Sequence, residues 1–191
     1  FFSRARDFGY SKTYTETFDI WEKEAVLKDV VRVIREFRPH LILTRFSPKP
    51  GGTHGHHTAS AILAMEAFDL AADPKAYPDC GKAWTTERLL WNTSWWFFRR
   101  SGQSFVPDTF LRVPTGHYVE ELGLSCPEIA AYARSQHKSQ GFGTTADFAD
   151  TLEYFQHLKG SRVSKDLLEG IPQSLEDLPG GKKADALINQ L

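Results

Sequence analysis

Cysteine is scarce in this sequence of 191 residues, which contains two, Cys80 and Cys126. They lie too far apart for a CxxC pair, so metal and redox motifs built on such pairs are excluded.

No apolar run approaches the roughly 20 residues that cross a bilayer, and no secretory signal is visible. We therefore expect no transmembrane segment. The sequence begins at Phe1 in mid-pattern, so an upstream segment is expected and no compartment is predicted.

An excess of charge of one sign is also absent. Lys and Arg number 23 and Asp and Glu 24, which gives a formal net charge of −1. A nucleic-acid-binding surface needs a clustered basic excess, so nucleic acid is not expected as a partner. Hydrophobic residues make up 41% and charged residues 25%, as in an ordinary globular domain that buries a core.

The first half of the chain alternates between helical and extended patterns. Apolar residues at helical spacing predict an amphipathic helix over 22–38, with Arg35 among the charged residues on its outer face. A proline ends this helix, and the apolar segment 41–46 predicts a buried strand. After a loop rich in Gly and Pro, residues 57–71 predict a second helix. Helix, strand, loop and helix form the repeating step of an α/β sheet with parallel strands.

The second half of the chain is less regular. An aromatic segment predicts a strand over 89–98, which we expect to pair with 105–113 in antiparallel fashion. A helix is predicted over 125–138, where Ser125 starts a capping box and a proline fits the first turn. A further short helix is predicted over 148–158.

A histidine cluster follows the predicted strand and contains three of the seven histidines. His54 and His57 are three residues apart and share one face at a helix start, whereas His56 points elsewhere. Neutral imidazole is a common zinc ligand, and catalytic zinc normally has three protein ligands. The cluster supplies one or two, and no other group of His, Asp or Glu has tight ligand spacing. A metal site is therefore predicted, but an incomplete one.

Each candidate residue also has a structural explanation. A His-x-x-His pair can arise by chance among surface and cap residues. Arg45, at the end of the predicted strand, is either a substrate-binding residue or part of a surface ion pair. Trp91, Trp95 and Trp96 either stack on sugar rings or pack in the core. His137 either contacts the site or caps the end of its helix before a glycine.

Residues 38–46, followed by His54-Gly55-His56-His57, resemble the second motif of the PIG-L/LmbE-type deacetylases. Residues 134–143 resemble the His-x-Ser-Gln segment that occurs late in the domain of that family. The resemblance covers roughly residues 1–160 and is closest to the long, multidomain members. It implies a deacetylase domain over 1–160, and residues 161–191 are then a polar tail or linker toward a possible further domain.

The resemblance implies a Rossmann-like α/β fold, with an open and mostly parallel sheet that has helices on both faces. It implies removal of an N-acyl group, usually acetyl, from an amino sugar such as N-acetylglucosamine or from a glycoconjugate. The cofactor is Zn²⁺, and His57 corresponds to a metal ligand. His54 corresponds to the residue that stabilises the oxyanion or protonates the leaving group.

One motif of the family is missing. His-Pro-Asp-Asp, which supplies the general base and the other two metal ligands, does not occur in the 191 residues. We expect this motif and the first strand to lie upstream, and we expect the chain alone to be inactive. The alternative is a catalytically inactive carbohydrate-binding or scaffold module with the same fold. A nucleotide-binding domain is disfavoured, because no P-loop or Gly-x-Gly-x-x-Gly is present.

Overall fold

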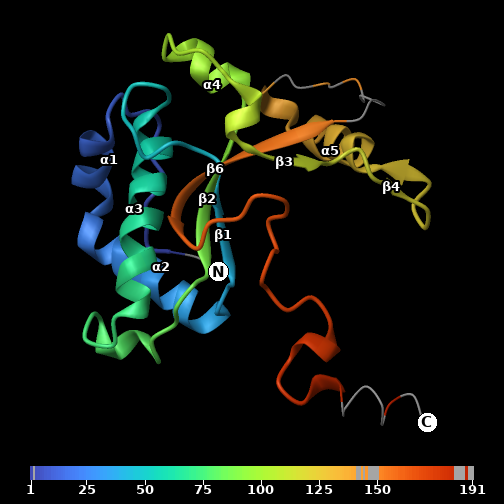
Figure 1. The fold of residues 1–191 in the computed structure, drawn as a ribbon. Coiled ribbons are helices and arrows are strands. Elements are labelled where there is room, and N and C mark those ends of the chain that lie inside the picture. Colours follow the sequence, from blue (N-terminus) through green and yellow to red (C-terminus); the bar gives the residue numbers. More distant parts are fainter. Residues whose placement is uncertain (2, 141–142, 144, 146–150, 183–187, 189–191) are drawn as a thin grey trace.

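The computed structural model describes residues 1, 3–140, 143, 145, 151–182 and 188. Its helices and strands follow one another as shown in Figure 1. The α-helices are α1 (Tyr14–Trp21), α2 (Lys23–Phe37), α3 (Gly55–Ala72), α4 (Trp95–Arg100) and α5 (Cys126–Ser135). The strands are β1 (Leu41–Thr44), β2 (Arg88–Thr93), β3 (Leu111–Pro114), β4 (Tyr118–Val119), β5 (Leu124–Ser125) and β6 (Leu152–Gly160). Short 3₁₀ turns are η1 (Pro78–Cys80), η2 (Pro107–Thr109), η3 (Lys138–Gln140) and η4 (Leu175–Asp177).

The main sheet has the strand order β1-β2-β6-β3, and β4 pairs with β5 in a separate ribbon. β1 and β2 are parallel, whereas β6 is antiparallel to both β2 and β3. The α/β class predicted from the sequence is confirmed. Three of these four strands, β1, β2 and β3, run in the same direction, which is compatible with the predicted mostly parallel sheet, while β6 inserts between β2 and β3 in the opposite direction. The Rossmann-like arrangement stays a prediction.

Helices α1, α2 and α3 form a layer on one side of the sheet (Figure 1). Val26, Val31 and Ile34 of α2 and Leu63 of α3 are buried between these helices. Ile42 of β1 packs against this core. Leu43 points to the opposite face and is 48% exposed, so β1 is less buried than its apolar sequence predicts. Helices on both faces therefore stay a prediction.

Three predicted helices are present in the described residues. The segments 22–38, 57–71 and 125–138 correspond to α2, α3 and α5. The capping box of α5 is also confirmed, since Ser125 and Glu128 exchange both of its hydrogen bonds. These elements were predictable because spacing and caps along the chain are enough to define them.

Three other predictions need correction. The segment 89–98 is a strand only in its first half, because the chain turns at Ser94 and enters α4. The segment 105–113 supplies β3, which pairs with β6 and not with β2. Residues 151–158 of the last predicted helix belong largely to β6, while 148–150 lie outside the described residues. Hydrogen bonds from strands on both sides hold β6 extended, and a short apolar run does not by itself distinguish helix from strand.

Arg35 is a further correction, since this side chain is buried and only 3% exposed. Its guanidinium reaches from α2 to the carboxyl end of α3 and the turn beyond it. There it donates hydrogen bonds of 2.7–3.1 Å to the carbonyl oxygens of Leu70, Ala71, Asp73, Ala76 and Tyr77. Carbonyls at a helix end lack partners within the helix. Three of these five also accept a backbone N–H, and the buried cation supplies the further hydrogen bonds.

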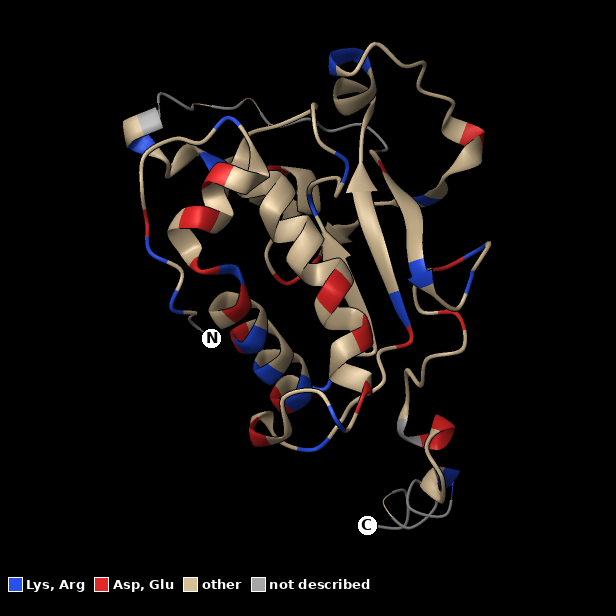
Figure 2. Cartoon of the chain, turned by 90° about the vertical axis from the view of Figure 1, so that its left-hand side faces the viewer, with Lys and Arg blue, Asp and Glu red and all other residues tan. Residues whose placement is uncertain are grey.

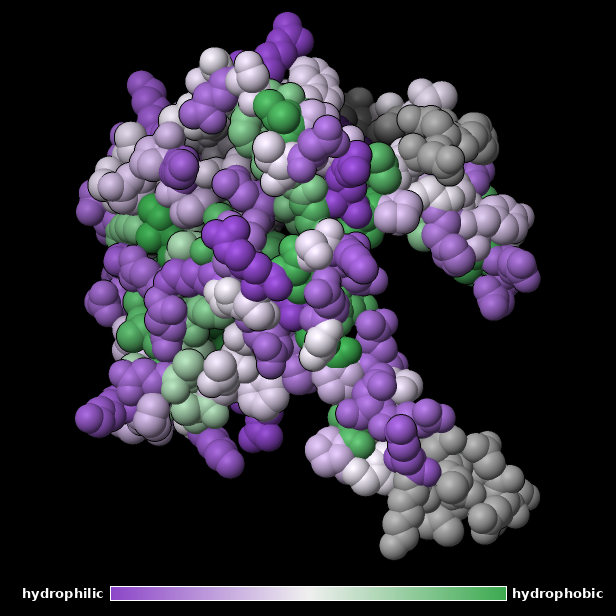
Figure 3. Space-filling model, viewed as in Figure 1, coloured by the Kyte–Doolittle hydropathy of each residue, from purple (hydrophilic) through white to green (hydrophobic). Residues whose placement is uncertain are grey.

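The predicted domain boundary near residue 160 coincides with the end of β6 at Gly160. The next segment returns to the sheet, where Arg88 donates to the carbonyl oxygens of Leu167 and Glu169 at 2.6 Å each. Its last described part then extends away from the sheet (Figures 1 and 3). The division into a domain and a linker stays a prediction.

In Figure 2, acidic and basic residues both occur along α2, whereas α1 and α3 carry acidic residues and no Lys or Arg. Among the described residues, no helix combines the length and the apolar character that a membrane span requires.

Candidate functional site

The candidate site lies at the start of α3, directly after the loop that leaves β1. His54 is the N-cap residue and has an extended backbone, with φ −63° and ψ 158°. His57 follows in the first turn. Their rings lie nearly parallel, at an angle of 12° and with centroids 5.3 Å apart. The predicted shared face is therefore confirmed.

His57 is half-buried and lies flat against Phe46, with ring centroids 3.7 Å apart and an angle of 4° between the rings. Burial lowers the pKa of His57 below its usual value, and the nearby His54 and His56 lower it further. The imidazole is therefore neutral at neutral pH. A neutral imidazole keeps a nitrogen lone pair, which is what a metal ligand needs.

His54 is more open to solvent. Its side chain makes no capping hydrogen bond, and its ring meets the edge of Tyr10 with centroids 4.8 Å apart. Both nitrogens of the ring are therefore accessible to a bound molecule. In this respect His54 differs from His57, whose ring is covered on one face by Phe46.

His56 points away from the other two histidines, as predicted, and it faces the N-terminal segment. Its Nδ1 is hydrogen-bonded to the Oγ of buried Ser11 at 3.0 Å, and its ring stacks on Phe8 with centroids 4.2 Å apart. Ser11 is also bonded to Thr17 of α1 at 2.8 Å. His56 therefore joins the N-terminal segment and α1 to the start of α3.

Gly55 allows this close approach. Its N–H donates to the carbonyl oxygen of Ser11 at 3.0 Å. A Cβ at this position would lie 2.1 Å from the carbonyl oxygen of Thr13, which is far inside van der Waals contact. The glycine between the histidines is thus required by the packing of the N-terminal segment.

Arg45 is held by neighbouring residues. One of its terminal nitrogens donates to the side-chain oxygen of Asn92 at 2.6 Å, and the guanidinium lies 5.4 Å from the ring centroid of Phe97. Asn92 in turn donates to Glu153 at 2.6 Å. The substrate-binding role of Arg45 stays a prediction.

Within the described ranges, no group of three or more His, Cys, Asp or Glu side chains is placed to hold a metal ion. His57, as a neutral imidazole beside a second imidazole, fits one ligand position of a zinc ion. Catalytic zinc normally takes three protein ligands. The described residues therefore fit part of a zinc site and do not complete it.

The remaining candidates lie elsewhere. His137 is exposed after α5, and its Nδ1 lies 3.2 Å from the carbonyl oxygen of Arg134, in keeping with a residue at a helix end. Trp91 is buried in β2, whereas Trp95 and Trp96 are 55% and 42% exposed on α4. Trp91 therefore packs in the core, whereas sugar stacking by Trp95 and Trp96 stays a prediction.

Two aromatic neighbours of the histidines were missed from the sequence. Phe46 was predicted only as the last residue of the strand over 41–46, and Tyr10 was not identified as a neighbour of His54. Phe46 could have been found, because a ring at the carboxyl end of a strand lies beside the helix that follows. Tyr10 contacts His54 because the N-terminal segment folds over α3, and no local sequence pattern predicts this contact.

Comparison with known proteins shows partial similarity to 1D-myo-inositol 2-acetamido-2-deoxy-alpha-D-glucopyranoside deacetylases. The protein from Streptomyces scabiei is 41% identical over 63 residues, which cover 33% of this chain and 19% of that protein. The protein from Rhodococcus jostii is 30% identical over 102 residues, covering 53% and 33%. Deacetylase 2 of Saccharopolyspora erythraea is 31% identical over 94 residues, covering 47% and 34%.

These matches span about a fifth to a third of the length of the relatives. No family model matches the chain. The similarity supports a relationship with deacetylases of amino sugars.

Proposed function

We propose that this protein is a zinc-dependent hydrolase of the PIG-L/LmbE type, which removes an N-acyl group from an amino sugar or glycoconjugate. The observation that carries the proposal is the pair of parallel imidazoles at the start of α3, one neutral and half-buried, the other exposed. The relatives support it, because their names describe removal of an acetyl group from an amino sugar joined to inositol.

His57 acts as a metal ligand in this proposal. Phe46 fixes the orientation of its ring, and the lowered pKa keeps the ring neutral over the range in which zinc enzymes work. Bound zinc would supply a water molecule whose pKa is lowered to about 7. The general base and the other ligands come from outside the described residues, as the family motif His-Pro-Asp-Asp implies.

His54 acts on the developing oxyanion in this proposal. Its exposed ring lies beside that of His57, so a donor nitrogen of His54 is available to a carbonyl held near His57. The charge on that carbonyl oxygen appears only as the tetrahedral intermediate forms, and a donor placed there lowers the barrier. A protonated ring can also give its proton to the leaving amine.

Zinc analysis and kinetics on the full-length protein test the proposal. His57→Ala should lower zinc content sharply and abolish release of acetate from N-acetylglucosamine derivatives. His56→Ala is the matched control, because it removes the same kind of side chain from the neighbouring position, where the ring faces Ser11. Full zinc occupancy in His57→Ala would overturn the assignment of this ligand.

A second candidate is a carbohydrate-binding or scaffold module without catalysis. It is favoured by the incomplete set of metal ligands among the described residues. In that case the full-length protein binds amino sugars without zinc and without releasing acetate.

The hydrolase proposal also predicts that the 191-residue chain, purified alone, shows no turnover. Measurable activity of this chain would contradict the need for further ligands.

A further inference from the structure

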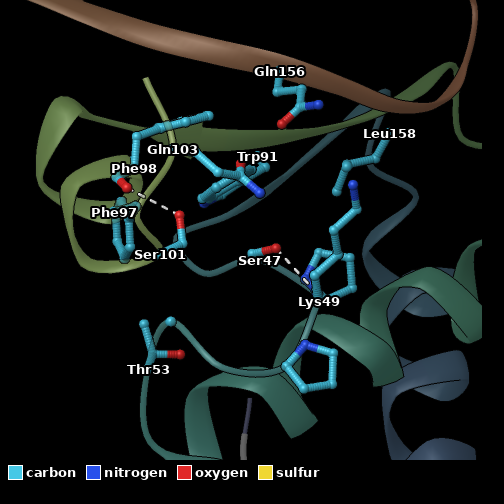
Figure 4. Close-up of a pocket in the computed structure, with 13 residues that line it drawn as sticks. Ser47, Lys49, Thr53, Trp91, Phe97, Phe98, Ser101, Gln103, Gln156 and Leu158 are labelled. Atoms are coloured by element: carbon cyan, nitrogen blue, oxygen red, sulfur yellow. Dashed lines mark hydrogen bonds between the residues drawn. The ribbon is translucent and has the colours of Figure 1, made fainter. Parts of the chain in front are cut away.

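Helix α4, at the top of the molecule in Figure 1, has a buried face and an exposed face. Phe97 is only 7% exposed and meets the ring of Trp91 with centroids 5.6 Å apart. Phe98 stacks on the same indole with centroids 6.0 Å apart. Figure 4 shows both side chains beside Trp91, with the hydroxyl of Ser101 donating to the carbonyl oxygen of Phe98 at 3.0 Å. These contacts fix α4 to β2, so its other face is held in one orientation toward solvent.

The exposed face of α4 carries two pairs of an indole and a guanidinium. Trp95 and Trp96 are 55% and 42% exposed. The guanidinium carbon of Arg99 lies 5.9 Å from the ring centroid of Trp95, and that of Arg100 lies 5.2 Å from the centroid of Trp96. Each cation thus lies over the ring four residues before it, as the helical spacing allows. We call these four side chains the α4 surface.

The positive charge of the α4 surface has no acidic counterpart nearby in the sequence. No Asp or Glu occurs between Glu87 and Asp108, and Asp108 is itself paired with Arg112 at 3.2 Å. Within the part of the chain that the structure describes, neither Arg99 nor Arg100 takes part in an ion pair. Both residues are exposed, so their guanidinium groups are available to an anionic partner.

An exposed indole beside a cation matches the boundary between lipid and water. Trp is enriched at this boundary, where its amphipathic ring lies at the level of the headgroups. Arg packs its aliphatic stem on apolar groups and keeps its guanidinium in water, where anionic headgroups attract it. The α4 surface offers both kinds of side chain together on a rigidly held helix.

A protein or a sugar chain fits this surface less well. A standard protein–protein interface takes about 20–30 residues from each side, whereas the α4 surface is one face of a six-residue helix followed by the polar residues 101–104. A sugar ring needs a free indole face to stack on, and a cation already lies over one face of each indole. Insertion among lipid headgroups requires no complementary shape, so a small surface is enough.

We propose that the α4 surface docks on a membrane surface that contains anionic lipids. Trp95 and Trp96 lie among the headgroups, and Arg99 and Arg100 bind the lipid phosphates. Phe97 stays buried in the protein and holds α4 in place. The contact is peripheral and is weakened by salt, because exposed charges are screened. It does not depend on the proposed hydrolysis.

Co-sedimentation of the full-length protein with lipid vesicles tests this proposal. Vesicles of phosphatidylcholine and phosphatidylglycerol in equal parts should bind the protein, whereas vesicles of phosphatidylcholine alone should bind it much more weakly. Arg99→Gln combined with Arg100→Gln should lower the partition coefficient about 25-fold, because each cation near an anionic membrane contributes a factor of about five. The difference should shrink as salt is added.

Arg162→Gln combined with Lys165→Gln is the matched control. It removes the same charge from two exposed residues that follow β6. The N–H of the neighbouring Ser161 donates to the carbonyl oxygen of Glu87 at 2.9 Å, so this segment lies at the end of β2 opposite α4. The control should bind anionic vesicles nearly as well as the unmodified protein.

Trp95→Ala combined with Trp96→Ala tests the indoles separately. This variant should also bind less, and its loss should persist at high salt, because salt screens charges and not the burial of apolar rings. All substituted side chains are exposed, so thermal unfolding should be unchanged. If the Trp variant unfolds early, the Arg variant decides alone.

Equal binding of the α4 variants and the control would overturn the proposal, and so would failure of the unmodified protein to bind anionic vesicles. Two further results would replace the membrane by another partner. Retention on dextran sulfate without binding to vesicles, lost in the Arg variant, would indicate an anionic sugar chain. Self-association in light scattering without binding to vesicles, lost in the Trp variant, would indicate a second copy of the protein.

Discussion

The two ends of α3 are built in opposite ways. At the carboxyl end, the buried guanidinium of Arg35 bonds the carbonyl oxygens of the last turn and of the loop that follows. At the amino end, the N-cap residue His54 makes no side-chain hydrogen bond. One end is closed by a cation that no ligand can reach, and the other presents two imidazoles.

Within α3, the contacts that stabilise the helix end lie at the carboxyl end, and the candidate functional side chains lie at the amino end. Backbone groups at a helix end need partners, and a residue that satisfies them inside the protein is not available to bind a ligand. The amino end obtains part of its stability from the backbone of Ser11 through the N–H of Gly55. The side chains of His54 and His57 remain available for chemistry.

The largest expected effect concerns His54. His54→Ala in the full-length protein should lower kcat about 10²–10³-fold, because one donor to the oxyanion is lost. Zinc content and much of the substrate affinity should remain. The measurement is kcat, KM and zinc content on one preparation. Loss of zinc in step with activity would make His54 a ligand, and unchanged activity would place the donor elsewhere.

Arg35 should dominate stability at the other end. Arg35→Leu removes five hydrogen bonds that the guanidinium donates to carbonyl oxygens, and we expect the free energy of unfolding to fall by about 3 kcal/mol. Arg32→Leu is the matched control, since Arg32 is part of a surface ion pair with Asp29 at 3.4 Å, and its loss should cost less than about 1 kcal/mol. Urea unfolding of both variants decides the matter. Equal losses would mean that Arg35 does not hold the end of α3.

Gly55 tests whether the amino end depends on the N-terminal segment. Gly55→Ala places a Cβ 2.1 Å from the carbonyl oxygen of Thr13, so that the segment must move away from α3. We expect a loss of stability of about 1–3 kcal/mol, as for other overpacked sites, together with lower activity. Gly52→Ala is the control, because a Cβ there would meet nothing within 4 Å. Equal stability of the two variants would contradict the observed packing.

The smallest effect concerns pH. The pKa of His57 is lowered in the folded protein, chiefly by burial, so the unfolded chain binds a proton more readily. Its contribution to stability is therefore complete above the unfolded pKa of about 6.5 and is lost as the pH falls toward the folded pKa. The free energy of unfolding of chelator-treated protein is measured between pH 5 and 8, assay values chosen to bracket about 6.5. It should be lower at the acid end. His57→Gln should reduce that drop, and an unchanged profile would speak against a neutral His57.

Much of this protein was determined by local sequence. The helices α2, α3 and α5 and the strand β1 follow from apolar spacing, capping residues and proline positions, which act over one or two turns. The shared face of His54 and His57 follows from their separation by three residues at the start of a helix.

Only the tertiary structure decided the rest. β6 is a strand because β2 and β3 offer hydrogen bonds on both of its sides, although its sequence was interpreted as helical. Arg35 is buried because carbonyl oxygens 35 to 42 positions later in the chain surround it and accept its hydrogen bonds. The ring contacts of Phe46 with His57 and of Tyr10 with His54 arise in the same way. In each case the partner is distant in sequence or lies across a loop, and the free energy of the contact exists only once the chain has folded.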